Sequence, residues 1–315
     1  MELASPKVHL IYNPAAGPWD AQNALKRVCA ELGRRGWSVE LCNTGKAGDA
    51  SVMAREAAQA GCDAVIVAGG DGTLNEAVNG LIGTQTALGV LPVGTGNRWA
   101  RQLRIPHFMI FNPLLVHETA AALANATVRS VDVGRANERY FLCWAGIGLD
   151  AQVTAEIEPR PKYTKHWGTL AYIVAAFKVA REFRGVHTRV ELDGRATRGR
   201  TLLVLASNIQ EYAGGLHIIN GARVNDGLLD ICICKGLGFS YALRHAFAML
   251  SRRSFQDPKI VYRQARSITV RTEKPIPLQV DGDPVDTTPV TITVVPRALR
   301  VLVPHSAPML LFSAP

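Results

Sequence analysis

The 315-residue sequence contains no long hydrophobic run, which argues against a membrane-spanning helix. None of its apolar segments reaches the roughly 18 residues that such a helix needs. The first residues, Met1 to Pro6, lack a basic segment followed by an apolar core, so we expect no signal peptide.

Metal-binding and disulfide patterns are also missing. The six cysteines form no Cys-x-x-Cys pair, and each lies in or beside an apolar stretch. The eight histidines show no metal-ligand spacing. We therefore expect free, buried thiols in a reducing cytoplasm rather than disulfides or zinc.

The charge is unbalanced, with 35 Lys and Arg against 26 Asp and Glu, a net charge of +9. A basic surface attracts nucleic acids or anionic lipid headgroups. No segment interleaves aromatic and basic residues, so we expect no nucleic-acid binding. An anionic membrane surface and a merely basic protein remain as alternatives.

Two patterns divide the chain. Up to about residue 125, strands alternate with helices, which predicts a Rossmann-like parallel α/β domain over residues 1–126. In its first helix, Asp20 is a candidate N-cap, and Gly33 and Gly36 are expected to end the helix. Short strands dominate residues 127–296 and predict a β-sandwich, with helices at about 167–183 and 240–250.

A glycine-rich segment follows a buried strand of the first domain. The strand Ala64–Val67 leads into Gly69-Gly70-Asp71-Gly72-Thr73, and a helix is predicted from Asn75 to Leu81. Glycines let the backbone approach a ligand closely, and helix N-termini favour phosphate. The carboxylate of Asp71 is a suitable group to bind a metal ion or to accept a proton. On spacing alone, a helix-capping turn is an equal alternative.

Two further loops resemble this one. The strands 8–12 and 88–91 also end in small, polar or glycine residues. The carboxyl ends of parallel strands meet at one edge of a sheet, where open α/β sheets bind ligands. We therefore expect the three loops to form one site.

Six motifs in order resemble the diacylglycerol kinase catalytic family, which includes bacterial lipid kinases, sphingosine kinases and ceramide kinases. The resemblance spans roughly residues 7–303. The motifs are Asn13-Pro14 with Gly17, Gly70 to Glu76, Gly94 to Asn97, Gly146 to Ala151, Asn225 to Asp230, and Val280 to Pro284.

The resemblance implies ATP and Mg²⁺ as cofactors and an active site in the cleft between the two domains, with the last strand, 297–305, returning to the first domain. It implies nucleotide contacts from the first domain. The residues are Asn13, Pro14, Ala15, Ala16, Gly17, Thr44, Gly70, Asp71, Gly72, Thr73, Leu74, Asn75, Glu76, Thr95 and Asn97.

Catalytic carboxylates are implied at Asp71, Asp281 and Asp283. Most relatives have Glu at the third position, where it accepts the proton of the lipid hydroxyl. Asp283 keeps the charge but is one methylene shorter, and a misplacement of about 1 Å affects rate strongly. An acidic hairpin turn is the alternative interpretation.

The family's magnesium ligands are only partly present. Asp226 and the carbonyls of Arg223 and Leu228 match a metal loop, and Asp132 is a further candidate ligand. Arg98 stands where many relatives have Asp, so it is expected to weaken an Mg²⁺ network, and either to pair with Asp132 or to hold a phosphate.

The sequence thus predicts an ATP-dependent kinase for the hydroxyl of a diacylglycerol-like or sphingoid-like lipid. The alternatives are an enzyme like NAD kinase and a non-catalytic nucleotide- or lipid-binding relative. The predicted partners are the lipid substrate, an anionic membrane contacted peripherally from the cytoplasm, and a second copy in a homodimer.

Overall fold

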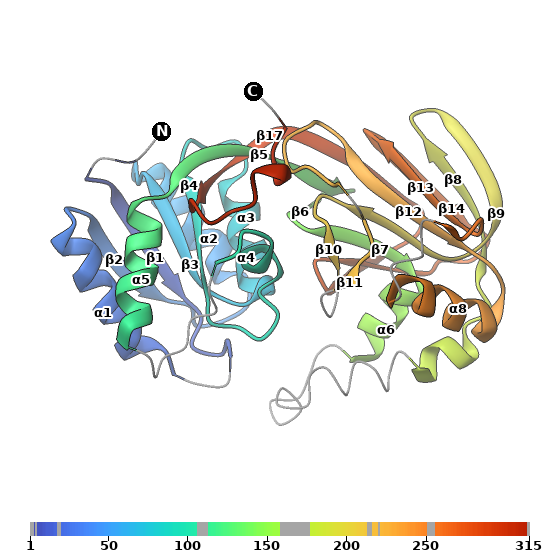
Figure 1. Cartoon of the computed structure of the whole chain (residues 1–315), viewed down its shortest axis with the longest axis horizontal. Coiled ribbons are helices and arrows are strands. Elements are labelled where there is room, and N and C mark those ends of the chain that lie inside the picture. The colour runs from blue at the N-terminus through green and yellow to red at the C-terminus, as the bar shows by residue number, and fades with distance from the viewer. Residues whose placement is uncertain are drawn as a thin grey trace. The chain divides into compact units, whose positions relative to one another are not determined.

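The strand–helix alternation predicted for the first part of the chain is present in the computed structural model (Figure 1). The structure describes residues 3, 5–17, 20–105, 113–157, 177–212, 216–219, 221–250 and 256–313. They form two compact units. The first contains residues 1–132 and 297–311, and the second contains residues 133–296 and 312–315. The first unit thus extends beyond the expected boundary at 126, and the chain returns to it at Arg297.

The first unit is built on a parallel sheet with strand order β4-β3-β1-β2, joined at β4 by the end of β17. Its elements in chain order are β1 (Lys7–Tyr12), α1 (Gln22–Arg34), β2 (Ser38–Asn43), α2 (Asp49–Gln59), β3 (Ala64–Gly69), α3 (Asp71–Leu81), β4 (Ala87–Pro92), α4 (Arg98–Gln102), α5 (Pro113–Ala124), the first part of β5 (Thr127–Ala136), the last part of β17 (Val290–Val303) and the 3₁₀ helix η4 (Met309–Leu311).

Side chains alternate across β1 because successive residues of a strand point to opposite faces. Val8, Leu10 and Tyr12 pack in one core with α1 and α5. Helices α2 and α3 pack on each other, and both contact the sheet strands. Burial of one such apolar side chain stabilises the fold by about 1.5–3 kcal/mol. The two-sided arrangement confirms the predicted α/β fold.

The start and end of α1 differ from the prediction by one turn or less. The helix begins at Gln22, and the Asp20 carboxylate accepts the Gln22 N–H at 2.9 Å. The expectation that Gly33 ends the helix is wrong, because α1 continues through it to Arg34. The chain leaves the helix at Gly36, whose φ of +86° favours glycine.

The second unit is mainly antiparallel, and inward side chains from most of its strands meet in one core, as predicted for a β-sandwich. Its elements are β6 (Arg139–Phe141), β7 (Trp144–Gly148), α6 (Leu149–Ile157), β8 (Val186–Leu192), β9 (Arg195–Ser207), β10 (Glu211–Tyr212), β11 (Leu216–His217), β12 (Leu229–Lys235), α8 (Gly238–Leu250), β13 (Ile260–Ala265), β14 (Ser267–Thr272), β15 (Pro277–Val280), β16 (Asp283–Thr287) and the remaining parts of β5 and β17. Of the helix expected at 167–183, residues 177–182 are helical, and 167–176 lie outside the described residues.

Candidate functional site

The glycine-rich segment after β3 is more tightly wound than predicted. The expected helix start at Asn75 is wrong, because α3 begins at Asp71 and places Asp71-Gly72-Thr73 in its first turn. Gly70 precedes the helix in an extended conformation, with φ −95° and ψ −175°. The first backbone amides of a helix have no acceptor within the helix. The N-terminus of α3 therefore offers N–H donors at the end of β3.

The three predicted loops come together at the ends of β1, β3 and β4. A Cβ on Gly94 would lie 2.6 Å from the Cα of Gly70, and a Cβ on Gly17 would lie 2.1 Å from the Val93 carbonyl oxygen. Real Cβ atoms do not approach other atoms this closely, so both positions require glycine. The result is a backbone-lined surface beside a helix N-terminus, which suits an anion.

Asn13 connects the first loop to α3. Its side-chain amide donates to the Thr73 hydroxyl at 2.8 Å, and its side-chain oxygen accepts the Ala15 N–H at 2.9 Å. Both the loop after β1 and the first turn of α3 are thereby held by one side chain. Within this loop Pro14 and Ala15 are exposed, and Ala16 and Gly17 are half-buried.

The loop after β4 is shaped by Asn97, which has a left-handed φ of +51° and donates to the Gly94 carbonyl at 2.6 Å. Asn97 is buried, whereas Thr95 at the tip of the loop is exposed. Thr44, which follows β2, is half-buried, and its N–H donates to the Tyr12 carbonyl at 2.8 Å. Of the three predicted contacts, Thr95 has the most accessible side chain.

Asp71 and Arg98 form an ion pair across the site. The Asp71 carboxylate accepts the Arg98 N–H at 2.7 Å, and its other oxygen lies 3.6 Å from the Arg98 guanidinium. The same carboxylate fills the space in which a Cβ on Gly96 would lie. Asp71 therefore joins the start of α3 to the loop after β4. The cation beside it offsets the negative charge that would otherwise repel a phosphate.

Three predicted contacts have side chains committed elsewhere. Leu74 and Asn75 are buried, and Asn75 accepts a hydrogen bond from Asn79 at 3.2 Å. The Glu76 carboxylate accepts the Ala50 N–H at 3.3 Å, at the start of α2. These side chains help to hold α3 in place, and contact of these residues with a nucleotide stays a prediction.

Asp132, the further candidate metal ligand, is fully buried in the first unit. Its carboxylate accepts the N–H of Arg297 at 2.7 Å, where the chain returns in β17. Arg297 has a left-handed φ of +52°. The carboxylate thus holds the returning strand, and a metal-binding role for Asp132 stays a prediction.

Asp281, in the second unit, is a structural carboxylate. One oxygen accepts the N–H groups of Cys143 and Trp144, and the other accepts that of Leu142, each at 2.9 Å. The side chain is 5% exposed. Because both oxygens already accept hydrogen bonds from backbone N–H groups, Asp281 is poorly placed to take a proton from a substrate. These hydrogen bonds hold the chain between β6 and β7, and the catalytic role of Asp281 stays a prediction.

Asp283 is less buried than Asp281, although only Gly282 separates them. It is the first residue of β16 and is half-buried. In the turn from β15 to β16, the Gln279 side chain accepts the Gly282 N–H at 2.7 Å and donates to Asp150 at 2.5 Å. Gly146 leaves room for this pair, since a Cβ there would lie 2.2 Å from an Asp150 oxygen.

The buried network of Gln279 and Asp150 was not predicted as part of the site. Asp150 lies in the first turn of α6, within the motif Gly146 to Ala151 that carries part of the family resemblance. An acid two residues after a Gly-x-Gly segment was the available signal. The network fixes the turn that presents Asp283.

The predicted metal loop precedes β12. The Asp226 carboxylate accepts the Leu228 N–H at 3.1 Å, which closes a tight turn. Burial and, to a smaller extent, the charge of Asp226 raise the pKa of Asp230 to about 6, against a hydrogen bond from Gln264 that lowers it. Two neighbouring carboxylates that repel each other fit a hard cation, because a cation between them would relieve the repulsion.

Comparison with known proteins identifies the family. Residues 7–136 match the diacylglycerol kinase catalytic domain, and residues 144–303 match the YegS C-terminal NAD kinase beta sandwich-like domain. A diacylglycerol kinase of Bacillus subtilis (strain 168) is 31% identical over 279 residues, covering 88% of this chain and 89% of that protein. The chain belongs to the diacylglycerol kinase family.

Further members of the family agree in length and fold. A diacylglycerol kinase of Staphylococcus aureus (strain MRSA252) is 30% identical over 302 residues, which cover 95% of this chain and 93% of that protein. A crystal structure of a candidate diacylglycerol kinase from Bacillus anthracis str. Sterne superposes with a TM-score of 0.78 at 27% identity, covering 96% of this chain and 99% of that one. These enzymes are phosphotransferases with an alcohol group as acceptor.

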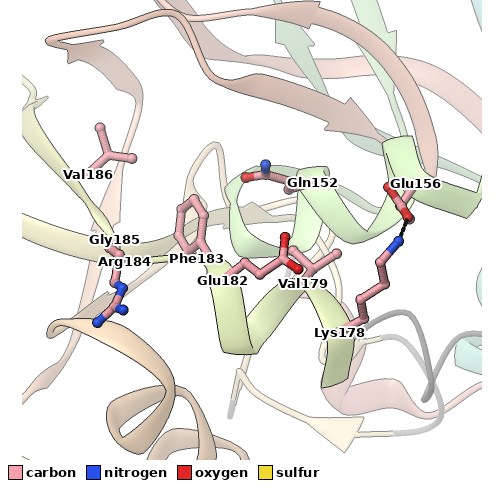
Figure 2. A pocket seen from close by; sticks show the side chains of 9 residues that line it. All are labelled: Gln152, Glu156, Lys178, Val179, Glu182, Phe183, Arg184, Gly185 and Val186. Carbon is pink, nitrogen blue, oxygen red and sulfur yellow. Dashed lines mark hydrogen bonds and ion pairs between the residues drawn. The ribbon is translucent and has the colours of Figure 1, made fainter.

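The second unit of this diacylglycerol kinase family member has a cavity of about 380 Å³ beside α6 (Figure 2). Glu156 and Lys178 form an ion pair at one side of it. Val179 and Phe183 belong to a small apolar cluster with Val153. None of the sequence-predicted site residues lines this cavity. Within the described part of the chain, no helix is both long and apolar enough to cross a membrane.

Proposed function

We propose that the protein transfers the γ-phosphate of ATP to the hydroxyl of a diacylglycerol-like lipid. The observation that carries the proposal is the close approach of Gly94 to Gly70 at the N-terminus of α3, since this backbone surface suits phosphate groups. The relatives described above, which are named diacylglycerol kinases, support the acceptor class. A sphingoid-like lipid is the second acceptor that the sequence motifs allow.

The nucleotide phosphates are proposed to lie against the loops after β1, β3 and β4. Backbone amides of Gly70 to Thr73 would donate to phosphate oxygens. The Arg98 guanidinium, held by Asp71, would face the same charge. Asn13 would hold the loop after β1 next to the first turn of α3 through its hydrogen bonds with Thr73 and Ala15. Asp71 then acts by positioning Arg98 and the loop after β4.

Asp283 is proposed as the general base. The lipid oxygen attacks the γ-phosphorus, the bond from that phosphorus to the bridging oxygen of ADP breaks, and the hydroxyl proton passes to the Asp283 carboxylate. This proposal requires the Asp283 carboxylate to reach the lipid hydroxyl when the γ-phosphate is transferred. Asp281 is a weaker candidate because its oxygens accept three backbone N–H groups.

Mg²⁺ is proposed as a second cofactor. Asp226, the carbonyls of Arg223 and Leu228, and Asp230 would hold one ion, and their neighbouring carboxylates fit a hard cation. Mg²⁺ that accompanies ATP would offset charge on the transferred phosphoryl group. Arg98 already places a fixed cation beside Asp71, so the first unit is expected to depend less on metal carboxylates there.

Peripheral contact with an anionic membrane from the cytoplasm is proposed for the second unit. Leu243 and Phe247 lie one helical turn apart on α8 and are 57% and 68% exposed. Phe177 is also exposed, and its ring contacts Phe239 of α8 at a centroid distance of 5.2 Å. Exposed apolar side chains on a protein of net charge +9 suit a surface of anionic lipids.

Acceptor specificity is tested by incubating the purified chain and radiolabelled ATP with diacylglycerol, sphingosine or NAD. We expect phosphorylated diacylglycerol as the main product. Transfer to NAD alone would favour the alternative of an NAD kinase-like enzyme. Nucleotide binding without transfer to any acceptor would favour a non-catalytic relative. The homodimer stays a prediction, which sedimentation of the full chain tests.

A further inference from the structure

Three potential metal ligands gather on two strands of the first unit. His9 lies on β1, and Glu40 and Cys42 lie on β2. The strands are parallel neighbours with His9 opposite Glu40 and Ile11 opposite Cys42. Because Glu40 and Cys42 are two residues apart, they point to the same face. One imidazole nitrogen, one carboxylate oxygen and the thiol sulfur all lie within 4.8 Å of one another.

The sheet face that carries this cluster is opposite to the core formed by Val8, Leu10 and Tyr12. The His9 Nε2 atom lies 2.7 Å from a Glu40 oxygen. The other ring nitrogen, Nδ1, is buried and has no hydrogen-bond partner within the described residues. A buried polar nitrogen without a partner costs free energy. The His9 ring therefore has hydrogen-bonding or ligand capacity that its protein neighbours do not use.

We infer that His9, Glu40 and Cys42 form a binding site for a thiophilic divalent cation of the Zn²⁺ class. Thiolate, imidazole and carboxylate are the donors that Zn²⁺ takes, usually in a tetrahedral arrangement. Three protein ligands leave the fourth position to water. A thiolate and an imidazole are poor ligands for Mg²⁺, which prefers oxygen. The site is therefore distinct in chemistry from the proposed magnesium loop, and it does not depend on the proposed kinase activity.

The sequence pattern excluded this site because the ligands are not close in the chain. His9 and Cys42 are brought together only by the parallel pairing of β1 with β2. The sequence rule looks for histidines and cysteines at short spacing, and none is present. All six cysteines are free thiols in the structure, but the expected burial is wrong for Cys29 and Cys42, which are half-buried. The Cys42 thiol is therefore available to a metal.

Binding would connect the outermost strand of the sheet to its neighbour. Strand β2 ends the strand order of the sheet and, among the described residues, pairs with β1 alone. A cation ligated by both strands binds the folded chain and not the unfolded one, so it raises the free energy of unfolding. On binding, the Cys42 thiol releases its proton to the buffer and becomes the thiolate ligand.

The experiment uses the reduced 315-residue chain. A chelator first removes bound metal, and the chelator is then removed by buffer exchange. Zn²⁺ affinity is measured by competition with a chromophoric chelator, and Co²⁺ is added separately as a spectroscopic probe. We expect one tight site per chain and a near-ultraviolet charge-transfer band from thiolate to Co²⁺. Thermal unfolding should shift upward with added Zn²⁺.

Three variants locate the site. Cys42→Ser should remove the charge-transfer band and weaken Zn²⁺ binding at least about tenfold, since even outer ligand partners are worth that much. Glu40→Gln removes a carboxylate that is 69% exposed, so this variant should fold, and it should also weaken binding. Cys29→Ser is the control, because Cys29 is a half-buried thiol of α1 outside the cluster.

The site would be supported if Cys42→Ser loses the charge-transfer band and Glu40→Gln binds Zn²⁺ more weakly. The control Cys29→Ser should keep both the band and the Zn²⁺ affinity of the parent. Unchanged Zn²⁺ affinity in both Cys42→Ser and Glu40→Gln would overturn it. A parent chain that binds no Zn²⁺ and whose unfolding temperature does not respond to the metal would also overturn it.

Discussion

Two aspartates separated by one glycine have different surroundings. Asp281 has a left-handed φ of +50°, and its carboxylate accepts three backbone N–H groups. Asp283 begins β16 and is half-buried. The sequence Asp-Gly-Asp gives no sign of this difference, because the amides that Asp281 accepts come from residues more than a hundred positions away. Only the fold shows that Asp281 accepts these three backbone N–H groups, which favours Asp283 as the proposed base.

The structural role of Asp281 makes a prediction about stability. Asp281→Ala would leave three N–H groups without their charged acceptor, so the free energy of unfolding should fall by roughly 3 kcal/mol. Urea unfolding followed by circular dichroism measures this change. Asp283→Asn is the matched control and should stay within about 0.5 kcal/mol of the parent. Equal stability of Asp281→Ala and the parent would show that the three hydrogen bonds contribute little.

At the scale of single elements, most strands were predictable because alternating or continuous apolar residues mark them. Helix ends were less predictable. The tertiary fit of α3 against the loop after β4 lets Asp71-Gly72-Thr73 enter the helix, although two of these residues are poor helix formers. Gly33 remains helical in α1 for a similar reason, because its neighbour Leu32 is anchored in the core. Propensity alone cannot foresee packing of this kind.

The glycine contacts of the loops predict a contrast between two substitutions. Gly94→Ala would place a Cβ 2.6 Å from the Gly70 Cα and push the two loops apart. We expect the KM for ATP to rise at least about tenfold, since small displacements of a binding surface are costly. Gly33→Ala has open space around its Cβ and should leave KM unchanged while stabilising α1 by up to about 1 kcal/mol. Steady-state kinetics on both variants gives the comparison, and an unaffected KM in Gly94→Ala would argue against the phosphate surface.

The turn before β12 predicts a dependence of stability on pH. Burial and the charge of Asp226 raise the pKa of Asp230 to about 6 in the folded chain, above its ordinary value near 4. Between these values the folded state binds more protons than the unfolded state. This contribution is therefore favourable at low pH and is lost as the pH rises through about 6, by roughly 3 kcal/mol at most.

Urea unfolding between pH 4 and pH 7, with a chelator present, measures this contribution. Asp230→Asn should remove it, so the parent and the variant should differ most in the slope of stability against pH. Added Mg²⁺ should restore stability to the parent at pH 7, because a cation offsets the paired carboxylates. The same slope in parent and variant would assign the pH dependence to other groups.

At the scale of the whole molecule, the sequence predicted two units of different class from the change in pattern near residue 127. The change marks where strand–helix alternation stops, but β5 continues from one unit into the other, and the first unit extends to Asp132. No local signal in a continuous strand marks such a boundary. The convergence of three loops was predictable, because parallel strands end at one edge. The hydrogen bonds of Asp132 and Asp281 were not, because their donors are distant backbone amides.

Membrane contact is expected to combine charge with the exposed side chains of α8. The double variant Leu243→Ser, Phe247→Ser should bind anionic vesicles several-fold more weakly than the parent in a sedimentation assay. Binding of both proteins should weaken with salt, since exposed charges are screened over about 10 Å at 0.1 M. Val52→Ser removes an apolar side chain of similar exposure from α2 and should bind like the parent. Equal binding by all three proteins would place the contact elsewhere.

The central claim is phosphoryl transfer to a lipid hydroxyl with Asp283 as the base. Its most direct test is the rate of phosphate transfer from radiolabelled ATP to diacylglycerol in mixed micelles, measured for the parent and for Asp283→Asn. We expect the parent to phosphorylate the lipid and kcat of the variant to fall by about 10²-fold or more, with little change in the KM for ATP. Asp283→Glu, which keeps the carboxylate, should remain active. Transfer by Asp283→Asn at the parent rate, or no transfer by the parent, would contradict the account.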